Sequence, residues 1–430
     1  MIAPPASSPS TAPPMSTASR PFATLALAAL AAVAAPAQAP KPDKTPKWRI
    51  DPFTKNAPEA MAKAGYVNYG PFVFGEVAGK PVQSSDIDAR LEFTKILWAE
   101  TRHFRIGLNL PEWTVPMDPE TRGKIRTELE ELQKTLPGVN PKARTLDPWL
   151  RLHVTAWRLE KLYAETSALF GVKDEDFPAD STKVVRQPDA RYMGYGPYLG
   201  MKEKYLVFVT EKAAPFQEYM KTYVLRDSAL PQRWHYKDSG SLLICFCTES
   251  DKFPLKHDTA LHCALNFNVS INLLDGFRFY AYDLPVWIRE GFGHWNSRRV
   301  SGDWSSFDQN EGSTADMRVV AKWDVYCRNL LGSPKLTPFP EVVAWRDFGN
   351  IKFDDHVATW SRIDWMIAQG PEKWQKFLFG VKGRVDENWG ADQTDLVGAT
   401  REALQAAYGV STLDFDRKWA EWVKATYPTQ

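Results

Sequence analysis

The sequence predicts an α+β protein in which strands and helices share the earlier part of the chain and helices fill the C-terminal region. Short apolar runs typical of buried strands occupy residues 205–209 and 241–247. Longer segments with apolar side chains at helical spacing occupy residues 148–170 and much of residues 306–430. The chain has 430 residues, 44% of them hydrophobic, so it is long enough to bury a substantial core.

The N-terminus has the features of a secretory signal peptide. Arg20 precedes an apolar run over residues 22–35, and small residues follow up to Ala37. This run is shorter than the roughly 20 residues that cross a bilayer, which favours cleavage over a retained anchor. We therefore expect residues 1–37 to be removed and the protein to be exported to the periplasm or the extracellular space. No membrane span is then expected, and the Pro- and Lys-rich residues 38–60 are expected to form a linker.

An N-terminal α/β region is expected over residues 61–200. It contains a strand at residues 104–108, where apolar side chains alternate with others. Helical patterns follow at residues 119–136 and 148–170, and Gly171 is expected to cap the second of these helices.

Two further regions complete the expected organisation: a core over residues 201–305 and a helical region over residues 306–430. The elements expected in them, in chain order, are a strand at 205–209, a helix at 215–224, a strand at 241–247, a helix at 259–272 with Asp258 as its N-cap, a helix that begins at Pro285, and a helix at 314–331.

Charge and cysteine content narrow the classes of partner. The formal net charge is +1 and no cluster of Lys and Arg stands out, so we do not expect a nucleic-acid partner. The four cysteines, Cys245, Cys247, Cys263 and Cys327, form no evident disulfide framework. A bond between one of the first two and Cys263 is one alternative, and four buried free thiols are the other.

Two segments carry the features that bear on chemistry: residues 261–266, with the sequence Leu-His-Cys-Ala-Leu-Asn, and residues 284–293, which include Glu290. In a helical H-E-x-x-H motif, the first and fifth residues present two imidazoles to zinc, and the Glu activates the bound water. Here His262 stands at the first ligand position. Cys263 replaces the general base, and Asn266 replaces the second imidazole.

These segments resemble the gluzincins, the thermolysin-like zinc metallopeptidases. In residues 284–293, Leu-Pro-Val-Trp-Ile-Arg-Glu-Gly-Phe-Gly is similar to the gluzincin segment whose Glu is the third zinc ligand, which implies that role for Glu290. Residues 409–416 with Trp419 and Trp422 resemble the closing helix, so the resemblance covers roughly residues 200–430. It implies a gluzincin-like core with a small mixed sheet, an edge strand at residues 241–247 beside a cleft, and active-site helices.

The replacements weaken the implied zinc site. Asn266 offers only a neutral carbonyl, which is a poor zinc donor. His294 lies four residues after Glu290 on the same helical face, so it is either a substitute ligand or a residue that supports a ligand. Zinc is therefore either absent or held by His262, Glu290 and His294. His356 falls where some relatives place a transition-state donor.

Three functions remain open. The leading hypothesis is an exported, non-catalytic pseudopeptidase that binds a protein or peptide or acts as a scaffold, with Cys263 inactive at the position of the base. The second is a divergent metal-dependent peptidase or other hydrolase that uses His262, Glu290 and His294. The third is a carbohydrate- or cell-envelope-binding protein, because many of the 17 tryptophans crowd the C-terminal region: Trp345, Trp360, Trp365, Trp374, Trp419 and Trp422.

Overall fold

The computed structural model describes residues 45–180, 182, 191–249, 255–305, 320–349 and 351–430. Residues 46–430 form one compact unit. The predicted signal peptide, residues 1–37, and the first part of the predicted linker lie outside the described residues. Within the described ranges, every helix is too short or too polar to cross a membrane.

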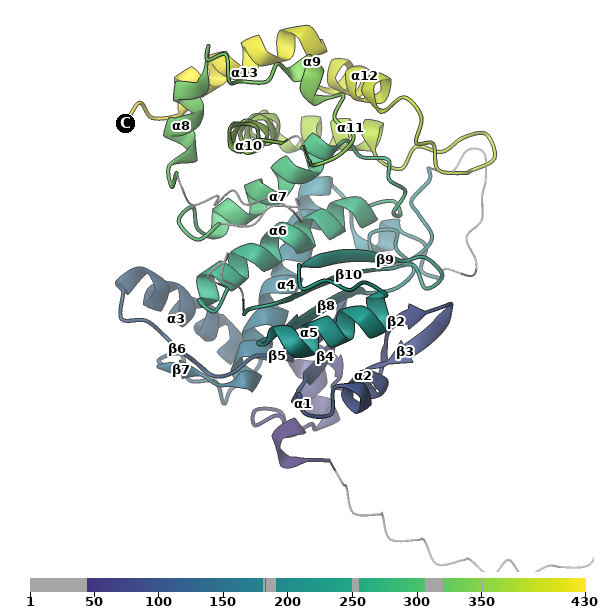
Figure 1. Cartoon of the computed structure of the whole chain (residues 1–430), viewed down its shortest axis with the longest axis vertical. Coiled ribbons are helices and arrows are strands. Elements are labelled where there is room, and N and C mark those ends of the chain that lie inside the picture. Colours follow the sequence, from purple (N-terminus) through teal and green to yellow (C-terminus); the bar gives the residue numbers. More distant parts are fainter. Residues whose placement is uncertain (1–44, 181, 183–190, 250–254, 306–319, 350) are drawn as a thin grey trace, which may run out of the picture. The chain divides into compact units, whose positions relative to one another are not determined.

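A six-stranded mixed sheet forms the centre of this unit (Figure 1). The middle strands β5, β8 and β10 run parallel, and antiparallel strands flank them on both sides. In spatial order the strands are β1 (Tyr66–Asn68), β4 (Leu97–Thr101), β5 (Phe104–Asn109), β8 (Tyr205–Thr210), β10 (Ser241–Cys247) and β9 (Gln232–Tyr236). Two two-stranded antiparallel sheets lie apart from it: the hairpin of β2 (Val73–Val77) with β3 (Lys80–Gln83), and β6 (Trp113–Thr114) paired with the more distant β7 (Thr145–Leu146).

The prediction that residues 241–247 form an edge strand is wrong, because this strand, β10, lies inside the sheet. It pairs with β8 on one side and with β9 on the other, so β9 forms the edge. A short turn at residues 237–240 joins β9 to β10, and Gly240 adopts a positive φ of 71° there. The polar residues of β9 gave it a weak strand pattern, so it was not predicted.

Both faces of the sheet are covered, which explains why its central strands read as continuous apolar runs. In β8, Val207 and Val209 belong to the core on the side of α4 (Pro148–Phe170) and α6 (Asp258–Gly276). Leu206 and Phe208 belong to the core on the side of α5 (Ala213–Tyr219). Parallel strands that are buried on both faces have no polar alternation. The sheet takes strands from residues 66–109 and from residues 205–247, so it spans the predicted boundary at residue 200.

Helix α4 begins and ends at capping residues. Asp147 accepts hydrogen bonds from the backbone N–H groups of Trp149 and Leu150 at the start of α4, and Gly171 ends α4 with a φ of 69°. The helices of the first half are α1 (Pro58–Lys63), α2 (Ser84–Arg90), α3 (Pro119–Gln133), α4 (Pro148–Phe170) and α5 (Ala213–Tyr219), which a π-helical turn at Met220–Val224 extends.

Helices α6 (Asp258–Gly276) and α7 (Val286–Val300) pack against each other between the sheet and the C-terminal helices (Figure 1). Every residue of α6 except Asn266 is buried. The N-cap of α6 is His257, whose side chain accepts from the N–H of Thr259, so the prediction of Asp258 as N-cap is wrong. Asp258 instead forms a buried ion pair with Arg158.

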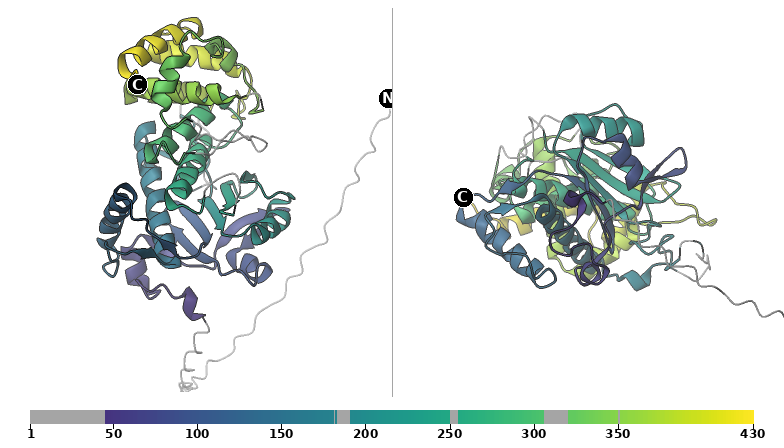
Figure 2. Two further views of the ribbon diagram at one scale, coloured as in Figure 1. Left: turned by 60° about the vertical axis from the view of Figure 1, so that its left-hand side comes forward. Right: turned by 90° about the horizontal axis from the view of Figure 1, so that it is seen from below.

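The C-terminal region is helical, as predicted (Figure 2). Its helices are α8 (Trp323–Leu330), α9 (Phe339–Val342), α10 (Phe353–Ala368), α11 (Pro371–Val381), α12 (Leu396–Tyr408) and α13 (Thr412–Thr426). The first part of the predicted helix 314–331 lies outside the described residues, and α8 begins at Trp323.

Of the six tryptophans that crowd the C-terminal region, Trp365, Trp374 and Trp419 are buried, and Trp345, Trp360 and Trp422 pack half-buried against the core. Core packing therefore accounts for the three buried rings and for part of the surface of the other three.

A buried ion cluster holds the C-terminal end of α6. Asp275 accepts from Arg233 of β9 at 2.5 Å and from Arg289 of α7 at 3.0 Å. Burial alone would raise the pKa of Asp275, but the two guanidinium groups outweigh burial and lower it. An acidic side chain is unfavourable at the C-terminal end of a helix, so the two arginines also offset the helix dipole.

We predict that Asp275→Ala lowers the free energy of unfolding by about 3–5 kcal/mol, because it leaves two buried guanidinium groups without their counterion. Urea denaturation at neutral pH measures this. Because the folded-state pKa is lowered, the stabilisation by Asp275 is present above its unfolded-state value of about 3.9 and is lost as the pH falls through the folded-state pKa. The control is Glu130→Ala, whose pair with Arg126 is exposed; an equal loss in both variants contradicts the prediction.

Candidate metal centre

Two glycines of α7 allow neighbouring helices to approach it closely. A methyl group at Gly291 would lie 2.6 Å from the carbonyl oxygen of Thr359 in α10, and one at Gly293 would lie 2.6 Å from the Ile271 side chain in α6. Any larger residue at either position would force the helices apart. The close approach of α10 brings His356, one turn before Thr359, against the α7 face that carries Glu290 and His294.

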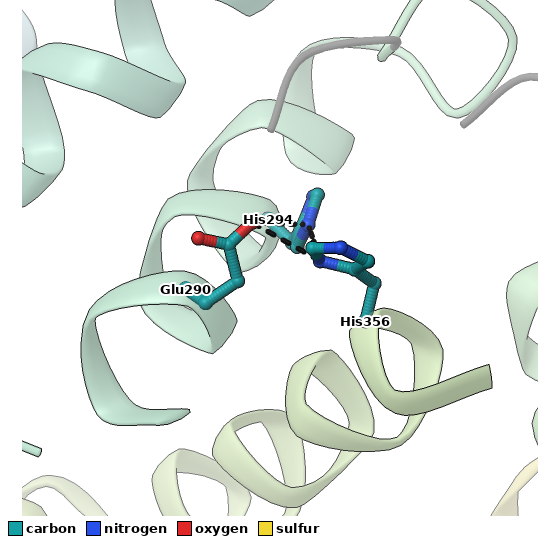
Figure 3. A group of neighbouring side chains, drawn as sticks. All are labelled: Glu290, His294 and His356. Carbon is teal, nitrogen blue, oxygen red and sulfur yellow. Dashed lines mark hydrogen bonds and ion pairs between the residues drawn. The ribbon is translucent and has the colours of Figure 1, made fainter. Parts of the chain in front are cut away.

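Glu290, His294 and His356 converge on one point between α7 and α10, as Figure 3 shows. Glu290 Oε1 lies 3.2 Å from His294 Nε2 and 3.1 Å from His356 Nδ1. The two imidazole nitrogens lie 3.1 Å apart. Glu290 and His294 are fully buried, and His356 is 2% exposed. The three potential ligand atoms therefore form a nearly equilateral triangle inside the protein.

This arrangement fits a divalent transition metal. Two imidazole nitrogens and one carboxylate oxygen are donors that zinc accepts, and zinc bonds of 2.0–2.1 Å in a tetrahedron separate neighbouring ligand atoms by about 3.3 Å. Among the described residues, no aligned hydrogen-bond donor faces either oxygen of Glu290. His294 Nδ1 also has no hydrogen-bond partner there. The buried carboxylate of Glu290 thus lacks an aligned donor, which is the arrangement that a bound cation would satisfy.

The charges of the cluster favour a cation. Burial alone would raise the pKa of Glu290, but its contacts with His294 and His356 lower the pKa to about 2. Burial lowers the pKa of His294 to about 4 despite the neighbouring carboxylate. At neutral pH the cluster therefore contains a buried carboxylate beside a neutral imidazole of His294, and neutral imidazole is the form that binds metals.

Aromatic rings enclose the cluster. The centroids of the Phe267 and Trp323 rings each lie 5.0 Å from the centroid of the His294 ring. A catalytic zinc site keeps one coordination position open to water and substrate, whereas a structural site is closed. The burial of all three residues is typical of a closed site.

The structure separates the predicted zinc residues into two places. It brings Glu290 and His294 together, but His262 is not part of their group and lies with its Nδ1 3.8 Å from Glu128 Oε1. His262 and Asn266 both line a different cavity, next to α3 and α4. In the predicted ligand set of His262, Glu290 and His294, His356 takes the place of His262. The sequence marked His356 only as a position where some relatives have a transition-state donor.

Cys263 is placed for packing. Its side chain is buried, and its thiol donates to the carbonyl of Ser301 at 3.7 Å. Burial raises the pKa of the thiol to about 12, so a negligible fraction is thiolate at neutral pH. All four cysteines are buried and free, so the alternative of a disulfide to Cys263 is wrong.

Comparisons with protein-family models, with curated proteins and with solved structures found no significant match. The likeness to gluzincins therefore rests on the residues of the two motif segments and on the closing helix.

We predict that a thiol reagent modifies none of the cysteines of the folded protein rapidly at pH 8 and modifies all four after unfolding in guanidinium. The reason is that each thiol is buried, and that burial raises the pKa of Cys263 to about 12. With a disulfide reagent that releases a coloured thiolate, absorbance measures the rate of modification. The Cys263→Ala variant shows which part of the signal comes from this residue. Rapid labelling that disappears in Cys263→Ala identifies a reactive nucleophile and contradicts the prediction.

Proposed function

We propose that this chain is an exported, gluzincin-like protein without peptidase activity, which binds a protein or peptide partner or acts as a scaffold. In this proposal Glu290, His294 and His356 hold one zinc ion, which joins α7 to α10. The observation that carries the proposal is the triangle of donor atoms 3.1–3.2 Å apart within a buried cluster. The metal contributes folding energy here, because its ligands come from two helices that it ties together.

Two features of the chain argue against a peptidase. Hydrolysis by a zinc-bound water needs a base beside the metal to take the proton, and at the motif position where gluzincins carry that carboxylate this chain has the buried thiol of Cys263. Substrate also needs access to the metal, and the candidate ligands are buried beneath Phe267 and Trp323. The divergent-hydrolase hypothesis required His262 beside Glu290, and His262 belongs to a different cavity.

We predict about one zinc per chain in the purified protein, and loss of that zinc in His294→Ala and in His356→Ala, because each variant leaves only two ligands. Elemental analysis of the dialysed protein measures the metal content. Removal of the metal with a chelator should also lower the unfolding temperature of the parent but not of either variant, since bound metal stabilises only the folded state.

The informative control is His262→Ala, which removes the histidine of the resembling motif but none of the three proposed ligands. It should retain zinc. If the parent binds no zinc even with the metal in excess, the metal proposal fails. If His262→Ala loses zinc while His356→Ala keeps it, the ligands are those of the alternative set, His262, Glu290 and His294. That result would favour the peptidase hypothesis.

A further inference from the structure

A cavity of about 420 Å³ lies among α3, α4, α6 and α7. It opens on the opposite face of α7 from the metal centre: Arg299, which lines the cavity, follows Glu290 by nine residues and is therefore rotated from it by about 180° around the helix. The cationic residues that line it are Lys124, Arg158, Lys161 and Arg299, and His262 and Asn266 of α6 form another wall.

The acidic residues of this cavity are already engaged. Glu128 binds Arg158 at 2.6 Å, and the same guanidinium group binds Asp258 at 2.7 Å. Glu165 lies 3.4 Å from Arg299 and 3.9 Å from Lys161. The carboxylates therefore balance three of the four cations that line the cavity.

Two polar groups are left over. The Nζ of Lys124 and the Nδ1 of His262 are buried and have no hydrogen-bond partner among the described residues. His262 Nδ1 lies 3.8 Å from Glu128 Oε1, which is too far for a hydrogen bond. Burial lowers the pKa of Lys124, and repulsion from Arg158 lowers it further. An ammonium group that is buried without a counterion raises the free energy of the folded protein, and a bound anion would offset this cost.

The donors define the ligand chemistry. An ammonium group and an imidazole N–H donate hydrogen bonds, and a negatively charged oxygen is their strongest acceptor. Trp157 and Leu162 add an apolar wall, which suits the organic part of a ligand. A cavity of about 420 Å³ is within the range of small-molecule sites, roughly 300–1,000 Å³. We propose that this cavity binds a small organic ligand through a carboxylate or phosphate group held by Lys124 Nζ and His262 Nδ1.

This site does not depend on the metal centre, since it shares no residue with it. It adds a small organic anion to the protein or peptide partner of the proposed function, and it assigns a role to His262 and Asn266 other than zinc binding. The two residues lie one turn apart on α6, and Asn266 is the one residue of this helix that is not buried.

The test is isothermal titration of the whole folded chain with inorganic phosphate and, separately, with succinate, at constant ionic strength in chloride. We expect a dissociation constant of about 1 mM or lower for at least one of the two probes. Lys124→Met should weaken that binding by about tenfold or more, because the ammonium is lost while the length of the side chain is kept. His262→Leu should weaken it as well, through the loss of one hydrogen-bond donor.

The matched control is Lys134→Met, at the C-cap of α3, where the lysine is exposed and pairs with Glu131. It should bind the probe as the parent does. The unfolding temperature of unliganded Lys124→Met should equal or exceed that of the parent, because a buried, unpaired charge has been removed. Binding of phosphate alone or of succinate alone supports the site and identifies the source of the oxyanion.

The proposal is overturned by either of two results. One is that neither probe binds with a dissociation constant of about 1 mM or lower. The other is that Lys124→Met and His262→Leu bind the probe as tightly as Lys134→Met does.

Discussion

The burial of α6 is the constraint on which the rest of the structure depends. Every residue of this helix but Asn266 is buried, so the charged side chains that it carries need partners within the protein. Asp258 at its first position pairs with Arg158 of α4, and Asp275 near its end pairs with Arg233 and Arg289. These ion pairs attach the helix to α4 at one end, and to the sheet edge and α7 at the other.

The two faces of helix α7 line two different sites. One face carries Glu290 and His294 toward α10, where aromatic rings and close backbone packing exclude water. The opposite face carries Arg299 toward a charged cavity shared with α3, α4 and α6. Residues that would surround a single zinc ion in a gluzincin are thus divided between a buried cluster and a cavity. This division is the physical basis for proposing binding in place of peptide hydrolysis.

Much of the local structure could be predicted from the sequence. The limits of α4 follow from Asp147 and Gly171, and the strand at residues 241–247 follows from its apolar run, because both signals are local. The position of β10 within the sheet could not be predicted, since it depends on β9, a strand whose polar residues leave little pattern. The role of Asp258 was also mistaken, because a residue at a helix start can cap the helix or pair with a distant arginine, and only the fold brings Arg158 near.

The same distinction applies to the candidate site. The spacing of Glu290 and His294 already places them on one face of a helix, because four residues are close to one helical turn. The sequence by itself also determined that the zinc motif lacks its base and its second imidazole, since Cys263 and Asn266 stand there. Only the tertiary structure decided which helix meets that face. Contact between Gly291 and the backbone of α10 brings His356 to Glu290 from 66 residues away, and no local pattern encodes a packing contact over that separation.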